Sequence, residues 1–180
     1  MIARLNRRHL LLGGLAAVTL PRGLIAQTAL LPAKGPALLT VTGKIGRSNA
    51  VDTTGAPKAV FDAELLDALP QHTVVTDTFW DTDQHAYRGP LLRDVMTACG
   101  VDLSTGSFKA QAINDFASVI PMEDITRWPV LLARFMDEQP LPRRTKGPLW
   151  IMYPRRGEPA LEWASIRNRW VWQLDRIIIL

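Results

Sequence analysis

The stretch that decides the fold is Lys-Gly-Pro-Leu-Trp-Ile-Met-Tyr-Pro, residues 146–154. Its apolar run, 149–153, predicts a buried strand, and Pro154 ends that strand because proline has no backbone N–H to donate to a sheet. The apolar run 130–136 predicts a second strand, separated from the first by a turn at 137–140. This part of the chain therefore indicates a β-rich core.

The same reasoning extends outward over the rest of the chain. Alternating or β-branched apolar residues indicate strands, whereas apolar residues on one side of a 3.6-residue repeat, next to capping residues or proline, indicate short helices. Strands predominate, so the sequence predicts one mixed α+β domain over residues 38–180. We expect further strands at 39–45, 73–78, 108–113, 116–120 and within 163–180, helices at 62–69, 121–128 and just before Gly100, and a hairpin turn at Asn114-Asp115.

Composition limits the classes of function. The 180 residues are 47% hydrophobic and 21% charged, which is enough for one domain with a hydrophobic core. Four of the 21 basic residues lie in residues 1–26, and the remainder of the chain carries 17 basic and 17 acidic residues. Because these charges are interleaved, the body has no concentrated basic face, and we expect no nucleic-acid partner.

Residues 1–26 have the pattern of an export signal. A start containing Arg4, Arg7 and Arg8 precedes an apolar stretch at 10–20 and a small-residue site at 24–26. The apolar stretch is shorter than the ~20 residues of a spanning helix, although an uncleaved anchor is the alternative. The arginine pair resembles a twin-arginine signal, and the general secretory route stays open. We expect a periplasmic protein with a flexible leader at 27–37.

The single cysteine, Cys99, excludes an intramolecular disulfide. It lies on the apolar side of its predicted helix, which favours a buried core thiol over a reactive or metal-ligating one. His72 and His85 have no second ligand at zinc spacing, so we expect no metal site. Motifs of serine hydrolases, phosphate-binding loops and dinucleotide sites are absent from the sequence. Three neighbouring acids lack the glycine and distal glutamate of a calcium loop and are expected to be solvated: Asp77, Asp81 and Asp83.

Three predicted turns combine aromatic with polar residues, at 79–88, 114–116 and 153–156. Aromatic rings can stack on a flat heterocycle, amides and carboxylates can bind its edge, and arginine can pair with an acidic group. The alternative is structural, with rim aromatics and an ordinary hairpin turn. The candidate ligand-binding residues are Trp80, Asp81, Arg88, Asn114, Asp115, Phe116, Tyr153 and Arg155.

From residue 41 to its end, the chain resembles the sulfite-oxidase-like molybdopterin-binding domain, specifically its small exported members. The matching segments occur in the order of the family, and the most specific is 146–154. The resemblance implies an α+β fold built around mixed sheets. The other matching segments are 87–95 with 100–101, 114–121, 131–141 and 170–177.

The departures from this family concern the metal cofactor. In the metal-bearing enzymes a cysteine at the end of the strand at 73–78 ligates molybdenum, and this strand has no cysteine. Threonine is a poor ligand for a soft redox metal, and Cys99 lies too far along the chain to replace the missing thiolate. A basic family residue is replaced by Trp150, and the lysine that holds the cofactor's phosphate is replaced by Val171.

The resemblance to the cysteine-less branch implies a periplasmic protein that binds a reduced pterin without molybdenum. It further implies action on the periplasmic domain of an inner-membrane sensor, either a kinase or a cyclic-dinucleotide enzyme. A molybdopterin-dependent oxidoreductase with an atypical metal ligand is the alternative, and a plain interaction module is a third hypothesis. In the first hypothesis Trp80 and Tyr153 flank the ring, Asn114 and Asp115 bind its pyrimidine edge, and Arg88 and Arg155 close the mouth. No catalytic residue is assigned.

Overall fold

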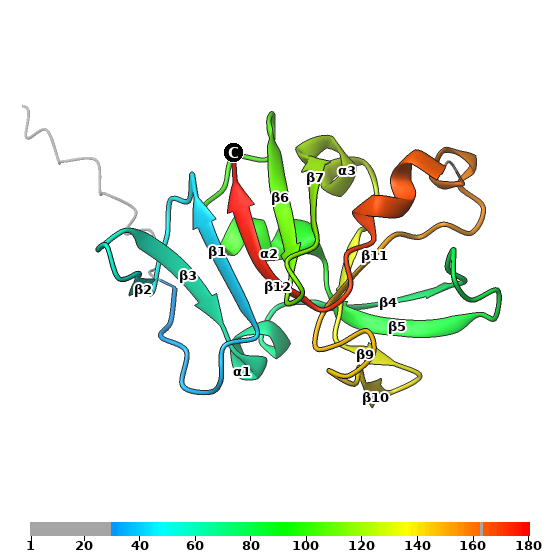
Figure 1. Cartoon of the computed structure of the whole chain (residues 1–180), viewed down its shortest axis with the longest axis horizontal. Coiled ribbons are helices and arrows are strands. Elements are labelled where there is room, and N and C mark those ends of the chain that lie inside the picture. Colours follow the sequence, from blue (N-terminus) through cyan, green and yellow to red (C-terminus); the bar gives the residue numbers. More distant parts are fainter. Residues whose placement is uncertain (1–29, 163) are drawn as a thin grey trace, which may run out of the picture.

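The computed structural model describes residues 30–162 and 164–180. Its largest element is a six-stranded sheet with the order β2-β3-β1-β12-β6-β7 (Figure 1). β1 and β12 are parallel, and every other neighbouring pair is antiparallel. The strands are β1 (Leu39–Gly43), β2 (Ala50–Val51), β3 (Pro57–Phe61), β6 (Ser107–Ala112), β7 (Ala117–Pro121) and β12 (Leu174–Ile179).

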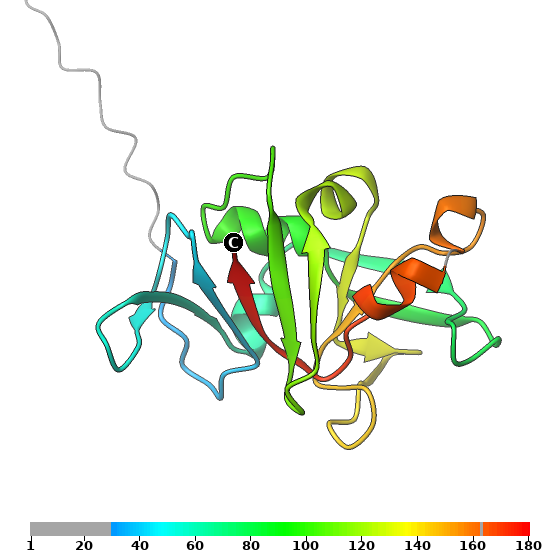
Figure 2. The same ribbon diagram turned by 45° about the horizontal axis from the view of Figure 1, so that its top comes forward.

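One face of this sheet is apolar because side chains alternate along each strand. Leu39 and Val41 of β1 are fully buried, and so are Phe108 and Ala110 of β6. Helix α2 (Leu92–Ala98) lies behind β12 and β6 in both ribbon views (Figure 2). The inner sheet face and this helix therefore form one core.

A smaller four-stranded sheet has the order β10-β9-β5-β4, and β8 pairs with β11 beside it. An isolated bridge between Trp150 and Trp172 connects β11 to the segment that leads into β12. The two sheet systems are thus joined next to a group of tryptophans. The strands are β4 (Gln71–Thr76), β5 (His85–Pro90), β8 (Leu131–Ala133), β9 (Phe135–Met136), β10 (Gln139–Pro140) and β11 (Trp150–Met152).

The helices are short and are fixed by caps and packing. Asp62 caps α1 by accepting a 2.9 Å hydrogen bond from the backbone N–H of Leu65. Of the one or two strands expected within 163–180, the described residues form one, β12, and the 3₁₀ helix η2 precedes it. Among the described residues no helix is long and apolar enough to cross a membrane. The remaining helices are α1 (Ala63–Asp67), α3 (Met122–Arg127), η1 (Pro159–Leu161) and η2 (Ala164–Arg169).

Most predicted elements are present with slightly different ends, but two predictions were wrong. The predicted turn 79–88 contains the first four residues of β5, a strand whose polar residues hid its pairing with β4. The single predicted strand at 130–136 divides at Arg134, whose backbone N–H donates to Arg88 instead. The predicted export signal and the first residues of the leader lie outside the described residues.

Candidate functional site

A cavity of about 360 Å³ lies where one end of the six-stranded sheet meets η2 and the β4–β5 loop. The loop contributes Trp80, the β6–β7 turn contributes Asn114 and Phe116, and η2 contributes Arg167 and Asn168. This volume falls at the lower end of the range for small-molecule sites, roughly 300–1,000 Å³. The full lining is Trp80, Ala112, Asn114, Phe116, Arg167, Asn168, Trp170 and Trp172.

Indole rings form much of the cavity wall. Trp80 and Trp172 meet edge to face with ring centroids 4.6 Å apart, and Trp150 packs 6.3 Å from Trp172. Trp170 stacks on Tyr153 at 5.8 Å, and its Nε1–H has no hydrogen-bond partner among the described residues. Trp80 is 37% exposed, which places part of this aromatic wall at the protein surface.

Two cations lie against the indoles. The ammonium of Lys146 is 3.5 Å from the ring centroid of Trp172, and 5.2 and 5.3 Å from those of Trp80 and Trp150. The guanidinium of Arg167 lies 5.1 Å from the Trp80 ring. Partial burial lowers the pKa of Lys146. None of the residues that line the cavity is acidic, and Arg167 is the one charged residue among them.

A buried polar network of Asp124, Tyr153 and Arg169 lies next to the cavity wall at Trp170. The Tyr153 hydroxyl donates to Asp124 Oδ2 at 2.7 Å, and Arg169 donates to both Asp124 oxygens at 2.9 Å. Burial raises the pKa of Tyr153 well above its usual range. Because Arg169 directly precedes Trp170, the network connects α3 and the end of β11 to the cavity wall.

The loop that carries Trp80 is held from both sides. The Thr78 hydroxyl accepts hydrogen bonds from the backbone N–H groups of Trp80 and Asp81, at 3.1 and 3.0 Å. Arg155 donates to Asp77 at 2.9 Å and lies over the Phe79 ring. The loop therefore has internal turn bonds and an ion pair to the segment after β11.

Three of the eight predicted site residues line the cavity, namely Trp80, Asn114 and Phe116. The other five do not line it. Arg88 lies over Phe135 and contacts Glu138, Arg155 pairs with Asp77 and Glu162, and Tyr153 is fully buried. Asp81 faces His85 at 3.4 Å, and Asp115 faces Arg176 at 3.3 Å.

Sequence reasoning missed the contributions of Arg167, Asn168 and Lys146. Trp170 and Trp172 were expected among the apolar residues of the C-terminal tail. Residues two positions apart in an extended segment point to the same side, so this spacing could have placed both indoles on one wall of a cavity. No periodic pattern marks η2, so its two polar lining residues had no comparable signal.

The donor set does not suit a metal held through a thiolate. Within residues 30–162 and 164–180, no group of three or more His, Cys, Asp or Glu residues could hold a metal ion. Cys99 is fully buried, as predicted, and burial raises its pKa to about 12, so the thiol stays protonated. At the end of β4, Thr76 and Thr78 are buried hydroxyl residues, which are poor ligands for molybdenum.

No protein-family model and no curated protein matches this chain. A solved structure that is similar to it is the crystal structure of the sulfane dehydrogenase SoxCD from Paracoccus pantotrophus. The likeness has a TM-score of 0.58 and 20% sequence identity, and covers 84% of this chain and 40% of that chain. The chain therefore shares its mixed α+β fold with part of that structure, and it spans less than half of that chain's length. This confirms the predicted α+β class, and at this identity the likeness concerns the fold alone.

Proposed function

We propose that this protein binds a reduced pterin that carries no molybdenum, in the tryptophan-lined cavity. The observation that carries the proposal is the combination of indole walls and two side-chain amides in a cavity that no thiolate lines. Aromatic faces bind a flat heterocycle by stacking and edge contacts, whatever its substituents. A volume of about 360 Å³ suits one small bicyclic ring system with a short side chain.

The amides of Asn114 and Asn168 suit the edge of a pterin. An aminopyrimidinone edge alternates donors and acceptors, and each asparagine supplies both. The Asn114 Oδ1 accepts the backbone N–H of Phe116 at 3.2 Å, which leaves the amide N–H groups for a ligand acceptor. In this proposal Asn168 takes the edge-binding role expected of Asp115, whose carboxylate faces Arg176.

We further propose that the protein is periplasmic and acts on the sensor domain of an inner-membrane signalling protein. This proposal rests on the export signal that the sequence of residues 1–26 predicts and on the family resemblance. The cavity mouth supports it, since Trp80 and Phe116 are 37% and 46% exposed and border the ligand space. A partner at this mouth would contact the protein and its ligand together.

The test is titration of the purified protein with a tetrahydropterin under anaerobic conditions. Binding should quench tryptophan fluorescence and raise the melting temperature. A ligand at 100 times its dissociation constant stabilises the fold by about 2.7 kcal/mol, which corresponds to roughly 5–11 °C for a domain of this size. Asn168→Ala should weaken binding, whereas Gln139→Ala, on exposed β10, should not. No response at about 1 mM ligand would refute the proposal.

Elemental analysis tests the oxidoreductase alternative. The fold likeness to a sulfane dehydrogenase is the observation in its favour. Protein purified from its native periplasm should contain a pterin by mass spectrometry and no molybdenum. Stoichiometric molybdenum would overturn the proposal and favour an enzyme with an atypical metal ligand.

A further inference from the structure

His85 lies between two carboxylates that belong to different parts of the chain. Its Nδ1 is 2.6 Å from Asp137 Oδ2, and its Nε2 is 3.4 Å from Asp81 Oδ2. Asp81 belongs to the β4–β5 loop and directly follows Trp80, which lines the cavity. Asp137 belongs to the tight turn between β9 and β10. The imidazole therefore joins the cavity loop to a neighbouring turn.

The Asp137 side of this contact is rigid. The backbone N–H of Ala86 donates to Asp137 Oδ1 at 2.9 Å, and the backbone N–H of Asp137 donates to the Ala86 carbonyl at 2.8 Å. Asp137 and Glu138 both have positive φ, at 49° and 62°, as in the two-residue turns of a hairpin. Asp137 thus serves as an anchor, whereas the Asp81 carboxylate makes the longer contact to His85, at 3.4 Å.

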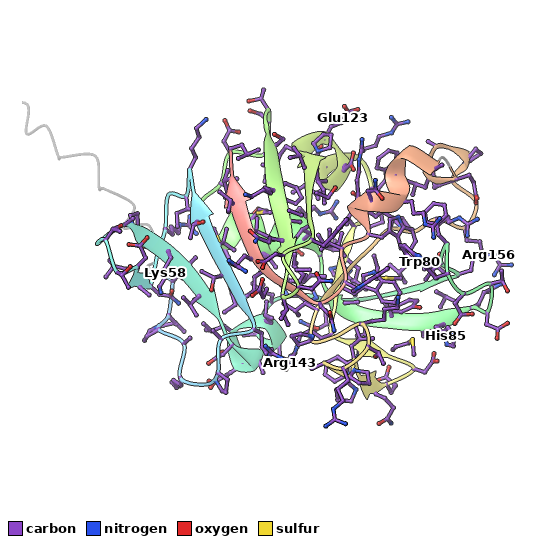
Figure 3. All side chains as sticks on the ribbon, viewed as in Figure 1. Lys58, Trp80, His85, Glu123, Arg143 and Arg156 are labelled. Carbon is purple, nitrogen blue, oxygen red and sulfur yellow. The ribbon has the colours of Figure 1, made fainter. Side chains whose placement is uncertain are left out.

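We propose that His85 is a pH-sensitive clamp that sets the position of Trp80 at the cavity mouth. Protonated His85 donates from both ring nitrogens and is attracted to both carboxylates. Neutral His85 has one N–H, and the short contact to Asp137 retains it. Its Nε2 lone pair then faces the Asp81 carboxylate, and this repulsion shifts the Asp81 end of the loop, while the turn bonds of Thr78 remain. Figure 3 shows Trp80, His85 and Arg156 at the same end of the β4–β5 hairpin.

The groups that face His85 favour its charged form. The hydrogen bond to Asp137 raises the pKa of His85 above 6.5, with further help from the charges of Asp137 and Asp81, against an opposing effect of burial. Tyr87 on β5 meets the imidazole edge to face, and burial raises its pKa to about 12, so it stays neutral. The Arg156 guanidinium donates to the side chain of Gln84, the residue before His85. The clamp is therefore closed below the raised pKa of His85 and opens as the pH rises through that pKa.

The experiment isolates Trp80 fluorescence as the difference between the native protein and Trp80→Phe, from about pH 5.5 to about 9. We expect a transition with a midpoint above 6.5. The transition should disappear in His85→Gln and persist in His72→Gln. His72 is the matched control because it lies on the neighbouring strand and is 3.9 Å from the single carboxylate of Asp94. Persistence in His85→Gln, or no transition in the native protein, would overturn the proposal.

Asp81→Asn provides a second variant that keeps the anchor contact between His85 and Asp137. Its Trp80 transition should vanish while His85 still titrates by NMR, with a midpoint shifted toward 6.5. An unchanged Trp80 transition in this variant would show that Asp81 is not the moving partner and would overturn the clamp.

The consequence for ligand binding rests on the proposed function. If pterin binds, its affinity should fall through the same transition in the native protein and stay level with pH in His85→Gln. A Trp80 transition without any pterin binding would sustain the clamp and refute the proposed function. Pterin binding with no Trp80 transition would sustain the proposed function and refute the clamp.

Discussion

The buried network around Asp124 is expected to be the largest single polar contribution to stability near the cavity. Its carboxylate side chain is 5% exposed and accepts from Tyr153 and from Arg169. Asp124→Ala removes all three hydrogen bonds and leaves a buried phenol and a mostly covered guanidinium without their acceptor. The substitution therefore tests whether this contact holds η2 against the sheet.

The expected cost follows from the burial of the three partners. Removing one member of a buried ion pair costs about 3–5 kcal/mol, because the remaining charge loses its compensation. The Arg169 side chain is 27% exposed, so water recovers part of this cost. We therefore expect the free energy of unfolding to fall by about 3 kcal/mol, the lower end of this range. At roughly 2–4 °C per kcal/mol, the melting temperature should fall by about 6–12 °C.

Urea unfolding followed by circular dichroism measures this free energy. Glu123→Ala is the control, because Glu123 is the preceding residue of α3 and projects into solvent with a 75% exposed side chain (Figure 3). It should change stability by less than about 0.5 kcal/mol. Tyr153→Phe removes only one hydrogen bond to the carboxylate and should cost about 1.5–3 kcal/mol. A loss below about 1 kcal/mol for Asp124→Ala would refute the reasoning.

Further predictions concern other buried groups. Tyr87 and Tyr153 have raised pKa values in the folded protein, so the unfolded chain releases their protons first and stability should fall as pH rises above 10. Absorbance at high pH should therefore show no tyrosinate until the fold is lost, and tyrosine ionisation in the folded protein would contradict this. Cys99 should resist thiol reagents in native protein and react within the unfolding transition, as followed by mass. Gly89→Ala should lower the melting temperature, since its Cβ would lie 2.1 Å from a carbonyl oxygen of β8, whereas Gly35→Ala meets nothing closer than 3.4 Å and should be tolerated.

The parts of the fold that the sequence predicted are those with strong local patterns. The alternation of Leu39 and Val41 identified β1, and the spacing of Leu92, Val95 and Met96 identified α2. Such patterns can be recognised within a single helix or strand, without knowing which other elements pack against it. Asn114 was placed in a turn for the same reason, and its turn lies at the cavity.

The roles of individual polar residues were harder to predict because their partners lie far along the chain. Tyr153 was expected to flank the ligand ring, but its hydroxyl donates a hydrogen bond to Asp124, 29 residues earlier, inside the core. Arg88 was expected at the cavity mouth, yet it contacts Glu138, 50 residues away. The order of charged residues along the chain does not show which of them pair in the fold. The acidic partner of an arginine is therefore known only once the structure is known.

These pairings also indicate how a cavity without a metal anchor could achieve affinity. Aromatic contacts are individually weak and depend on how well the rings are fixed before the ligand arrives. Here the ammonium of Lys146 lies among three indoles, the Thr78 hydroxyl fixes the turn that carries Trp80, and Asp124 fixes the segment before Trp170. Each support touches the wall rather than the ligand space. Affinity for a flat heterocycle should therefore respond to substitutions at these supports even where no ligand contact is lost.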